Sequence, residues 1–177
     1  NVFNYYKTTS GEYCWIHADD ELLGENALPY IIRQLKEFRP SLFINSSSCY
    51  SVPSDLPKRH KTYRDFLLSC IEIHPHYILA HTHLTLNIFK KDSLDISFAI
   101  KNTDTSYGQM YGLLYGLKHN EGSVLLADMP TTVIREKRAE PDKDTVEKKL
   151  YFDYENLNKH WVDYLSWIKT EFTLKHL

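Results

Sequence analysis

Apolar and polar residues repeat with two different periods along the chain, and the change of period predicts its elements. Apolar positions recur at helical spacing in four segments, 26–38, 61–73, 107–117 and 154 onward. Aromatic and β-branched runs predict strands at 12–16, 41–45, 77–89, 94–100 and 123–129. Polar stretches at 46–55, 102–106 and 135–149 are predicted as turns or loops. This alternation predicts an α/β fold with a mixed, mostly parallel sheet flanked by helices.

Two of the predicted helices carry a further pattern. Gly108, Gly112 and Gly116 recur at intervals of four, which indicates a face where another backbone approaches closely. The C-terminal helix has one apolar stripe, formed by Leu157, Trp161, Leu165, Ile168 and Phe172. Because its opposite face is not notably basic, we interpret the stripe as core or as a contact in a homo-oligomer, and not as a membrane anchor.

The composition and charge of the chain exclude some classes of function. The 177 residues are 42% apolar, enough to bury a substantial core, and the formal net charge of -2 offers no field that would hold nucleic acid. Three cysteines without a CxxC pair suit a reduced, cytoplasmic compartment. Charges interrupt every apolar run before the roughly 18 residues of a membrane span, so no transmembrane segment is expected.

Candidate chemistry begins where the first predicted strand ends, in the run His17-Ala-Asp-Asp-Glu21. Adjacent carboxylates repel each other, and a bound cation offsets that repulsion. Asp19 and Asp20 therefore predict a site for Mg²⁺ or Mn²⁺ bridging phosphate oxygens, and His17 is a third candidate ligand that favours Mn²⁺. The alternative is a solvated cap at a helix N-terminus.

Several segments together resemble family-2-type inverting glycosyltransferases, which have the GT-A fold. They are Gly11-Glu-Tyr-Cys-Trp-Ile-His-Ala-Asp-Asp-Glu-Leu-Leu, the segments 27–35 and 39–45, Leu84-Thr-Leu-Asn-Ile-Phe-Lys-Lys-Asp and Gly122-Ser-Val-Leu-Leu-Ala-Asp-Met-Pro. The resemblance implies transfer of a sugar from a nucleotide-diphosphate donor to a glycan or lipid-linked acceptor, in surface polysaccharide biosynthesis. It implies a metal-dependent enzyme, with peripheral association at the inner face of the membrane.

The resemblance also assigns regions and roles. Residues 1–138 would form the metal-site and acceptor-side part, and 139–177 a charged loop with the C-terminal helix. The family's preceding half, about ninety residues by the size of a typical domain, has no counterpart here, so the fold is expected to be incomplete at its N-terminus. Asp104 is the candidate base that deprotonates the acceptor, with helix capping as its alternative. Arg135 and Arg138 are candidates for closing over the diphosphate.

Two other classes stay open. The His17-x-Asp-Asp-Glu pattern also resembles zinc-dependent sugar N-deacetylases, in which His17 and Asp20 would bind zinc and Asp19 would activate water. That family's proline is replaced by Ala18, and no later His-x-Asp-His segment supplies a third ligand. A non-enzymatic α/β binding module is the remaining alternative. We interpret the His81 and His83 pair as packing or acceptor contact.

Overall fold

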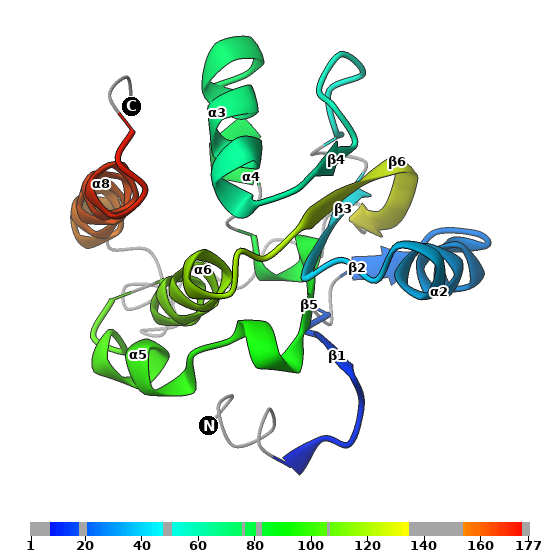
Figure 1. Ribbon diagram of the computed structural model, residues 1–177, viewed down its shortest axis with the longest axis horizontal. Helices are drawn as coiled ribbons and strands as arrows, with labels where there is room; N and C mark the ends of the chain where they lie inside the picture. Colours follow the sequence, from blue (N-terminus) through cyan, green and yellow to red (C-terminus); the bar gives the residue numbers. More distant parts are fainter. Residues whose placement is uncertain are drawn as a thin grey trace, which may run out of the picture.

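A curled mixed sheet with helices on both faces forms the centre of the computed structural model (Figure 1). The structure describes residues 8–17, 21–47, 51–75, 77–80, 83–105, 107–134 and 154–174. Its strands are β1 (Tyr13–Trp15), β2 (Glu21–Leu23), β3 (Leu42–Ser47), β4 (Arg59–His60), β5 (Asn87–Lys90) and β6 (Val124–Ile134). They lie in the order β1-β5-β3-β6-β2, and β4 also pairs with β6.

The mixed sheet flanked by helices is confirmed, but the prediction that it is mostly parallel is wrong for the described strands. Only β3 and β6 pair in parallel, whereas the four other pairings are antiparallel. Parallel neighbours need a crossover that returns the chain to the same end of the sheet. The short strands β2, β4 and β5 instead enter from the opposite end, and alternation of strands and helices in the sequence does not reveal that direction.

Helices cover the two faces of the sheet unequally. The α-helices are α2 (Ala27–Phe38), α3 (Tyr63–Ile73), α4 (Tyr77–Ala80), α5 (Ile96–Lys101), α6 (Gly108–His119) and α8 (Tyr154–Glu171), and the 3-10 turns are η1 (Leu84–Leu86) and η2 (Lys91–Ser93). Figure 1 shows α2 on one side of the sheet and α3, α5, α6 and α8 on the other. Successive strand residues point to opposite faces, so Leu42 and Ile44 enter the larger core while Phe43 packs with α2.

The helix predicted over 61–73 is confirmed, and its start has a clear local cause. Thr62 Oγ1 accepts a hydrogen bond from the backbone N–H of Asp65, and Asp65 Oδ2 accepts one from the backbone N–H of Thr62, both at 3.1 Å. This reciprocal capping box satisfies two amides that a helix start otherwise leaves unpaired. The helices predicted over 26–38, over 107–117 and from residue 154 onward are confirmed as α2, α6 and α8.

Two predicted strand segments are largely helical instead. The segment 94–100 contains α5, because the Asp95 side chain caps it by accepting from the N–H of Phe98 at 2.8 Å. The segment 77–89 begins with α4 and η1, and only its last residues belong to β5. In 94–100 the alternation of apolar and polar residues imitates a strand, and a short run does not separate the two periods.

The glycine spacing in α6 does mark a close approach of another backbone. A Cβ atom at Gly112 would lie 2.5 Å from the Cβ of Ala99, and one at Gly108 would lie 2.6 Å from the carbonyl oxygen of Asn102. A Cβ at Gly116 would overlap the carbonyl oxygen of Ser93. The absence of side chains therefore lets α6 pack directly on the segment from η2 to the end of α5.

The C-terminal helix belongs to the same core as α3 and α6. The predicted apolar stripe is confirmed as core at Ile168 and at Phe172, which directly follows α8. Trp161 and Leu165 are partly buried and pack against the same core. None of the helices in the described residues is long and apolar enough to span a bilayer.

Candidate functional site

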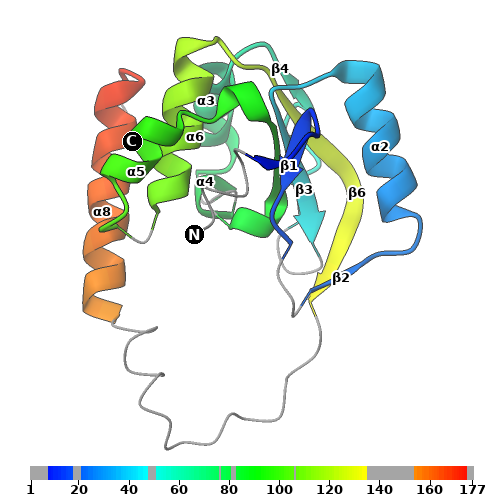
Figure 2. The same cartoon turned by 90° about the horizontal axis from the view of Figure 1, so that it is seen from below.

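The first and last residues of the acidic run, His17 and Glu21, lie at one end of the sheet. His17 follows β1, and Glu21 begins β2, which pairs with the last residues of β6. β3 and β6 are parallel and end on the same side, where α6 also begins (Figure 2). In open α/β sheets, ligands bind beyond the carboxyl ends of the strands. This end of the sheet is therefore the candidate site.

Thr85 forms hydrogen bonds with one residue just before the acidic run and with the last residue of the run. Its backbone carbonyl accepts a hydrogen bond from Trp15 Nε1 at 2.8 Å, and its hydroxyl donates to Glu21 Oε1 at 2.9 Å. Trp15 is the last residue of β1, and Glu21 is the first residue of β2. One residue thus fixes the chain immediately before and immediately after residues 16–20.

Buried polar side chains gather at the same strand ends. Asn45 and Ser46 of β3 lie next to Thr131 of β6, whose hydroxyl oxygen is 3.0 Å from both Asn45 Oδ1 and the Ser46 carbonyl oxygen. Among the described residues, Asn45 Nδ2, Thr132 Oγ1 and Glu21 Oε2 are buried and make no hydrogen bond. Buried polar atoms are normally paired, so unpaired ones mark a place for water, an ion or a ligand group.

Two histidines border this polar region. The ring of His17 meets the Trp15 ring edge to face, with centroids 5.0 Å apart. Burial lowers the pKa of His83, while the nearby Glu21 carboxylate acts in the opposite direction. A neutral imidazole carries a lone pair that can accept a proton or bind a metal.

Several predicted site residues lie outside the described residues. These are Asp19 and Asp20 of the metal site, Arg135 and Arg138 of the diphosphate loop, and His81. Of the predicted metal ligands, the structure places His17 alone, at the end of β1. Within the described residues, no group of three His, Cys, Asp or Glu side chains is arranged to hold a metal ion. The metal site therefore stays a prediction.

Asp104, the candidate base, lies exposed in the turn between α5 and α6. It does not cap α6: the capping position is Tyr107, whose backbone N–H is 3.3 Å from the hydroxyl oxygen of Thr105. The alternative role of Asp104 as a helix cap is therefore wrong. Figure 2 shows that α6 begins on the side where β3 and β6 end.

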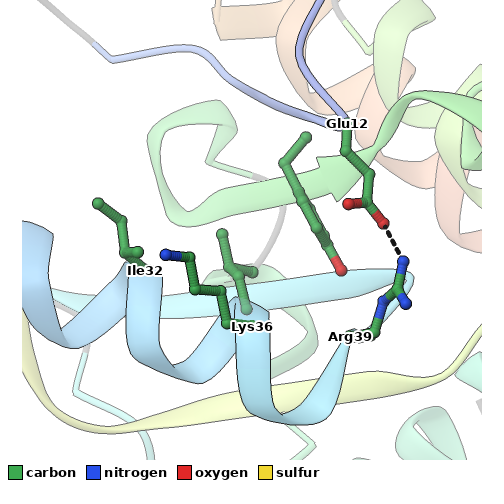
Figure 3. Close-up of a pocket in the computed structure, with 6 residues that line it drawn as sticks. Glu12, Ile32, Lys36 and Arg39 are labelled. Atoms are coloured by element: carbon green, nitrogen blue, oxygen red, sulfur yellow. Dashed lines mark hydrogen bonds and ion pairs between the residues drawn. The ribbon is translucent and has the colours of Figure 1, made fainter.

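A groove of about 380 Å³ lies elsewhere, between β1 and the second half of α2 (Figure 3). Its walls include Tyr13, Ile32 and Leu35, and its rim carries Lys36 and an ion pair of 3.2 Å between Arg39 Nη2 and Glu12 Oε1. None of the predicted site residues lines it.

The sequence interpretation missed Thr85, Asn45 and Thr132 as site residues. One signal was present for Asn45, because it is a polar residue that directly follows the apolar run Leu42-Phe-Ile44. No local pattern marks Thr85, since its partners Trp15 and Glu21 are 70 and 64 residues away along the chain.

Replacing Thr85 by valine is expected to destabilise the protein by roughly 1 to 2 kcal/mol, because the Glu21 carboxylate loses its only described hydrogen bond while the shape is kept. Urea unfolding measures the change. Thr103→Val is the matched control: it removes an exposed hydroxyl that bonds the Ile100 carbonyl at 3.0 Å, and we expect a smaller effect. Equal losses in the two variants would contradict the anchoring role.

Comparison with known proteins gives a fold likeness only. No family model matches the chain, and no curated protein matches it in sequence. Among solved structures it is similar to Staphylococcus aureus TarS, in the crystal structure of TarS 1-349 in complex with UDP-GlcNAc, with a TM-score of 0.48 and 11% identity. The matched region covers 88% of this chain and 42% of that chain. A likeness of this degree carries no conclusion about function.

Proposed function

We propose that this chain is the metal-site and acceptor-side part of a GT-A-type glycosyltransferase, which transfers a sugar from a nucleotide-diphosphate donor to a glycan or lipid-linked acceptor. The observation that carries the proposal is the pair of hydrogen bonds made by Thr85, which hold Trp15, just before the acidic run, and Glu21, its last residue, near the end of the sheet where β3 and β6 end. The sequence resemblance to family-2-type inverting enzymes supplies the reaction class.

The residues around the acidic run fit a hard divalent cation. Glu21 Oε2 is a buried carboxylate oxygen without a hydrogen bond among the described residues, directly after Asp20 in the sequence. Carboxylate oxygens are the ligands that Mg²⁺ and Mn²⁺ prefer, and an imidazole nitrogen favours Mn²⁺. Asp19, Asp20 and His17 would hold the ion, which would stabilise the charge on the leaving diphosphate.

The remaining roles in the proposal fall to three further residues. Asp104 would accept the proton from the acceptor hydroxyl, because its carboxylate is exposed in the turn that precedes α6, the helix that begins on the side where β3 and β6 end. Arg135 and Arg138, which follow β6, would contact the diphosphate, since guanidinium groups match phosphate oxygens in geometry and charge.

Thermal unfolding with nucleotide tests the proposal. Mn²⁺ with UDP or UDP-GlcNAc is expected to raise the melting temperature, because a ligand at about 100 times its Kd stabilises the folded state by about 2.7 kcal/mol. Asp20→Ala should abolish the shift. Asp163→Ala, which removes an exposed carboxylate of α8, should keep it.

The two alternative classes of protein, the zinc-dependent N-deacetylase and the binding module, predict different outcomes in the same experiment. Tightly retained zinc without a nucleotide response would point to the N-deacetylase alternative. No response to any nucleoside diphosphate and no bound metal would reject the transferase in favour of a binding module.

A further inference from the structure

A pocket lined by cations lies where β4 pairs with β6, and we call it the β4 pocket. Its volume is about 350 Å³, and it adjoins the first residues of β6, whereas the candidate site lies at the last residues of that strand. Pro40, Val124 and Leu125 supply apolar lining, and Arg59 and Lys61 supply positive charge. The described residues that line the pocket include no carboxylate.

The guanidinium of Arg59 has a defined position at this pocket. Its central carbon lies over the ring of Phe38, 3.7 Å from the ring centroid, at the end of α2. The N–H donors of a guanidinium lie in its plane, so contact of one face with a ring leaves them available. Neither Arg59 nor Lys61 forms an ion pair with a described residue. The two side chains can therefore bind an anion without first breaking an ion pair.

Three carboxylates lie near the pocket in the sequence, and only one of them lies near it in the fold. Asp65 belongs to the capping box of α3, and its charge acts on His60. Glu37 lines a separate hollow on α2 together with Arg33, and Glu121 lines another beside the end of α8. Positive charge is therefore in excess at the β4 pocket, with two cations against one neighbouring carboxylate.

A buried histidine adds a hydrogen-bond acceptor to the lining. His60 is 7% exposed, and burial lowers its pKa, so the imidazole is neutral at pH 7. Its ring hydrogen-bonds to the Pro57 backbone, while Nε2 is buried and makes no hydrogen bond among the described residues. Buried polar atoms are normally paired, so this nitrogen marks a place for a hydroxyl group or a water molecule.

A small phosphate ester matches this combination of groups. A guanidinium and an ammonium bind phosphate oxygens, apolar lining suits a carbon skeleton, and the imidazole nitrogen accepts from a hydroxyl. The volume lies within the range of small-molecule sites. We propose that the β4 pocket binds the phosphate monoester of a small hydroxylated molecule, such as a sugar phosphate, through Arg59 and Lys61. This site needs no metal ion and is separate from the proposed donor site.

Isothermal titration calorimetry in the presence of EDTA tests the inference apart from the proposed reaction. We expect glucose 6-phosphate or glycerol 3-phosphate to bind at one site, and inorganic phosphate to bind at least tenfold more weakly because it has no skeleton to contact the apolar lining. Added salt should weaken binding, since the attraction is electrostatic. Asp20→Ala should leave it unchanged, so failure of the nucleotide experiment does not affect this result.

Variants of the two cations test the assigned residues. Arg59→Gln and Lys61→Gln should each lower the affinity about tenfold, because each removes a charge-assisted hydrogen bond to the phosphate. Arg33→Gln is the matched control and should keep the affinity, since that guanidinium lies over the Tyr30 ring at 5.8 Å and lines a different hollow. Lys61 is exposed, so its variant tests the site even if loss of Arg59 loosens α2.

Three results would overturn the proposal. They are no binding of either ester, equal affinity for inorganic phosphate and the esters, and binding that Arg59→Gln and Lys61→Gln leave unchanged. Arg59 would then serve only to cover Phe38 and to place a positive charge at the C-terminal end of α2, where a cation is favourable. In that case Arg59→Gln lowers the melting temperature equally with and without the esters.

Discussion

Phe43→Ala is expected to destabilise the protein by about 3 to 5 kcal/mol, the cost of truncating a fully buried aromatic residue. Phe43 has 0% exposure and lies on the face of β3 that packs against α2, with its ring centroid 6.3 Å from that of Tyr30. Within the described part of the chain, the core on this face contains six buried residues, so few neighbours can move in to fill the cavity. Urea unfolding followed by circular dichroism measures the loss.

The control for this prediction keeps the apolar character and most of the volume. Phe43→Leu should cost less than Phe43→Ala, because a smaller cavity remains between β3 and α2. If alanine and leucine destabilise the protein equally, or if alanine costs less than about 1 kcal/mol, α2 is not held by the packing of Phe43 against it.

Gly116→Ala is the second change with a large expected effect, a destabilisation of about 3 kcal/mol. Helix propensity predicts the opposite sign, since alanine in place of glycine inside a helix is ordinarily stabilising by roughly 1 kcal/mol. A Cβ at this position overlaps the carbonyl oxygen of Ser93, and a backbone atom cannot rotate away as a side chain can. The close contact therefore outweighs propensity, and thermal unfolding gives the sign directly.

Gly24 provides the comparison for the same substitution without a clash. Its added Cβ would lie 3.5 Å from the carbonyl oxygen of Thr131, an ordinary van der Waals contact. Gly24→Ala should change stability by less than about 0.5 kcal/mol. A stabilised Gly116→Ala variant would mean that α6 does not pack against η2 as closely as described.

Local patterns were sufficient to predict the long elements of the fold. The four helices with a clear apolar period were found, and β1, β3 and the start of β6 followed from β-prone runs. The end of β6 was missed because Pro130 normally interrupts a strand; here it pairs with Ser46 at a register shift, where a proline is tolerated. Strand direction was mispredicted because it depends on contacts between distant segments.

Only part of the candidate site could be predicted from the sequence. The acidic run could be recognised because its chemistry is contained in neighbouring residues, and the structure places its first and last residues, His17 and Glu21, at the end of the sheet. The supporting residues Thr85, Asn45 and Thr132 come from three other segments, and folding alone brings them to the same place. Such residues are hard to predict from the sequence because each is ordinary in its local context.

The way in which β2 joins the sheet gives the candidate site a dynamic property. β2 has only three residues and is held by the last three residues of β6, by the hydrogen bond from Gly24 N–H to the Thr131 carbonyl and by the contact of Glu21 with Thr85. So short a terminal strand can open while the rest of the protein stays folded. Amide protons of β2 should therefore exchange with deuterium early, and a ligand that binds beside it should slow that exchange before it changes the exchange of β3.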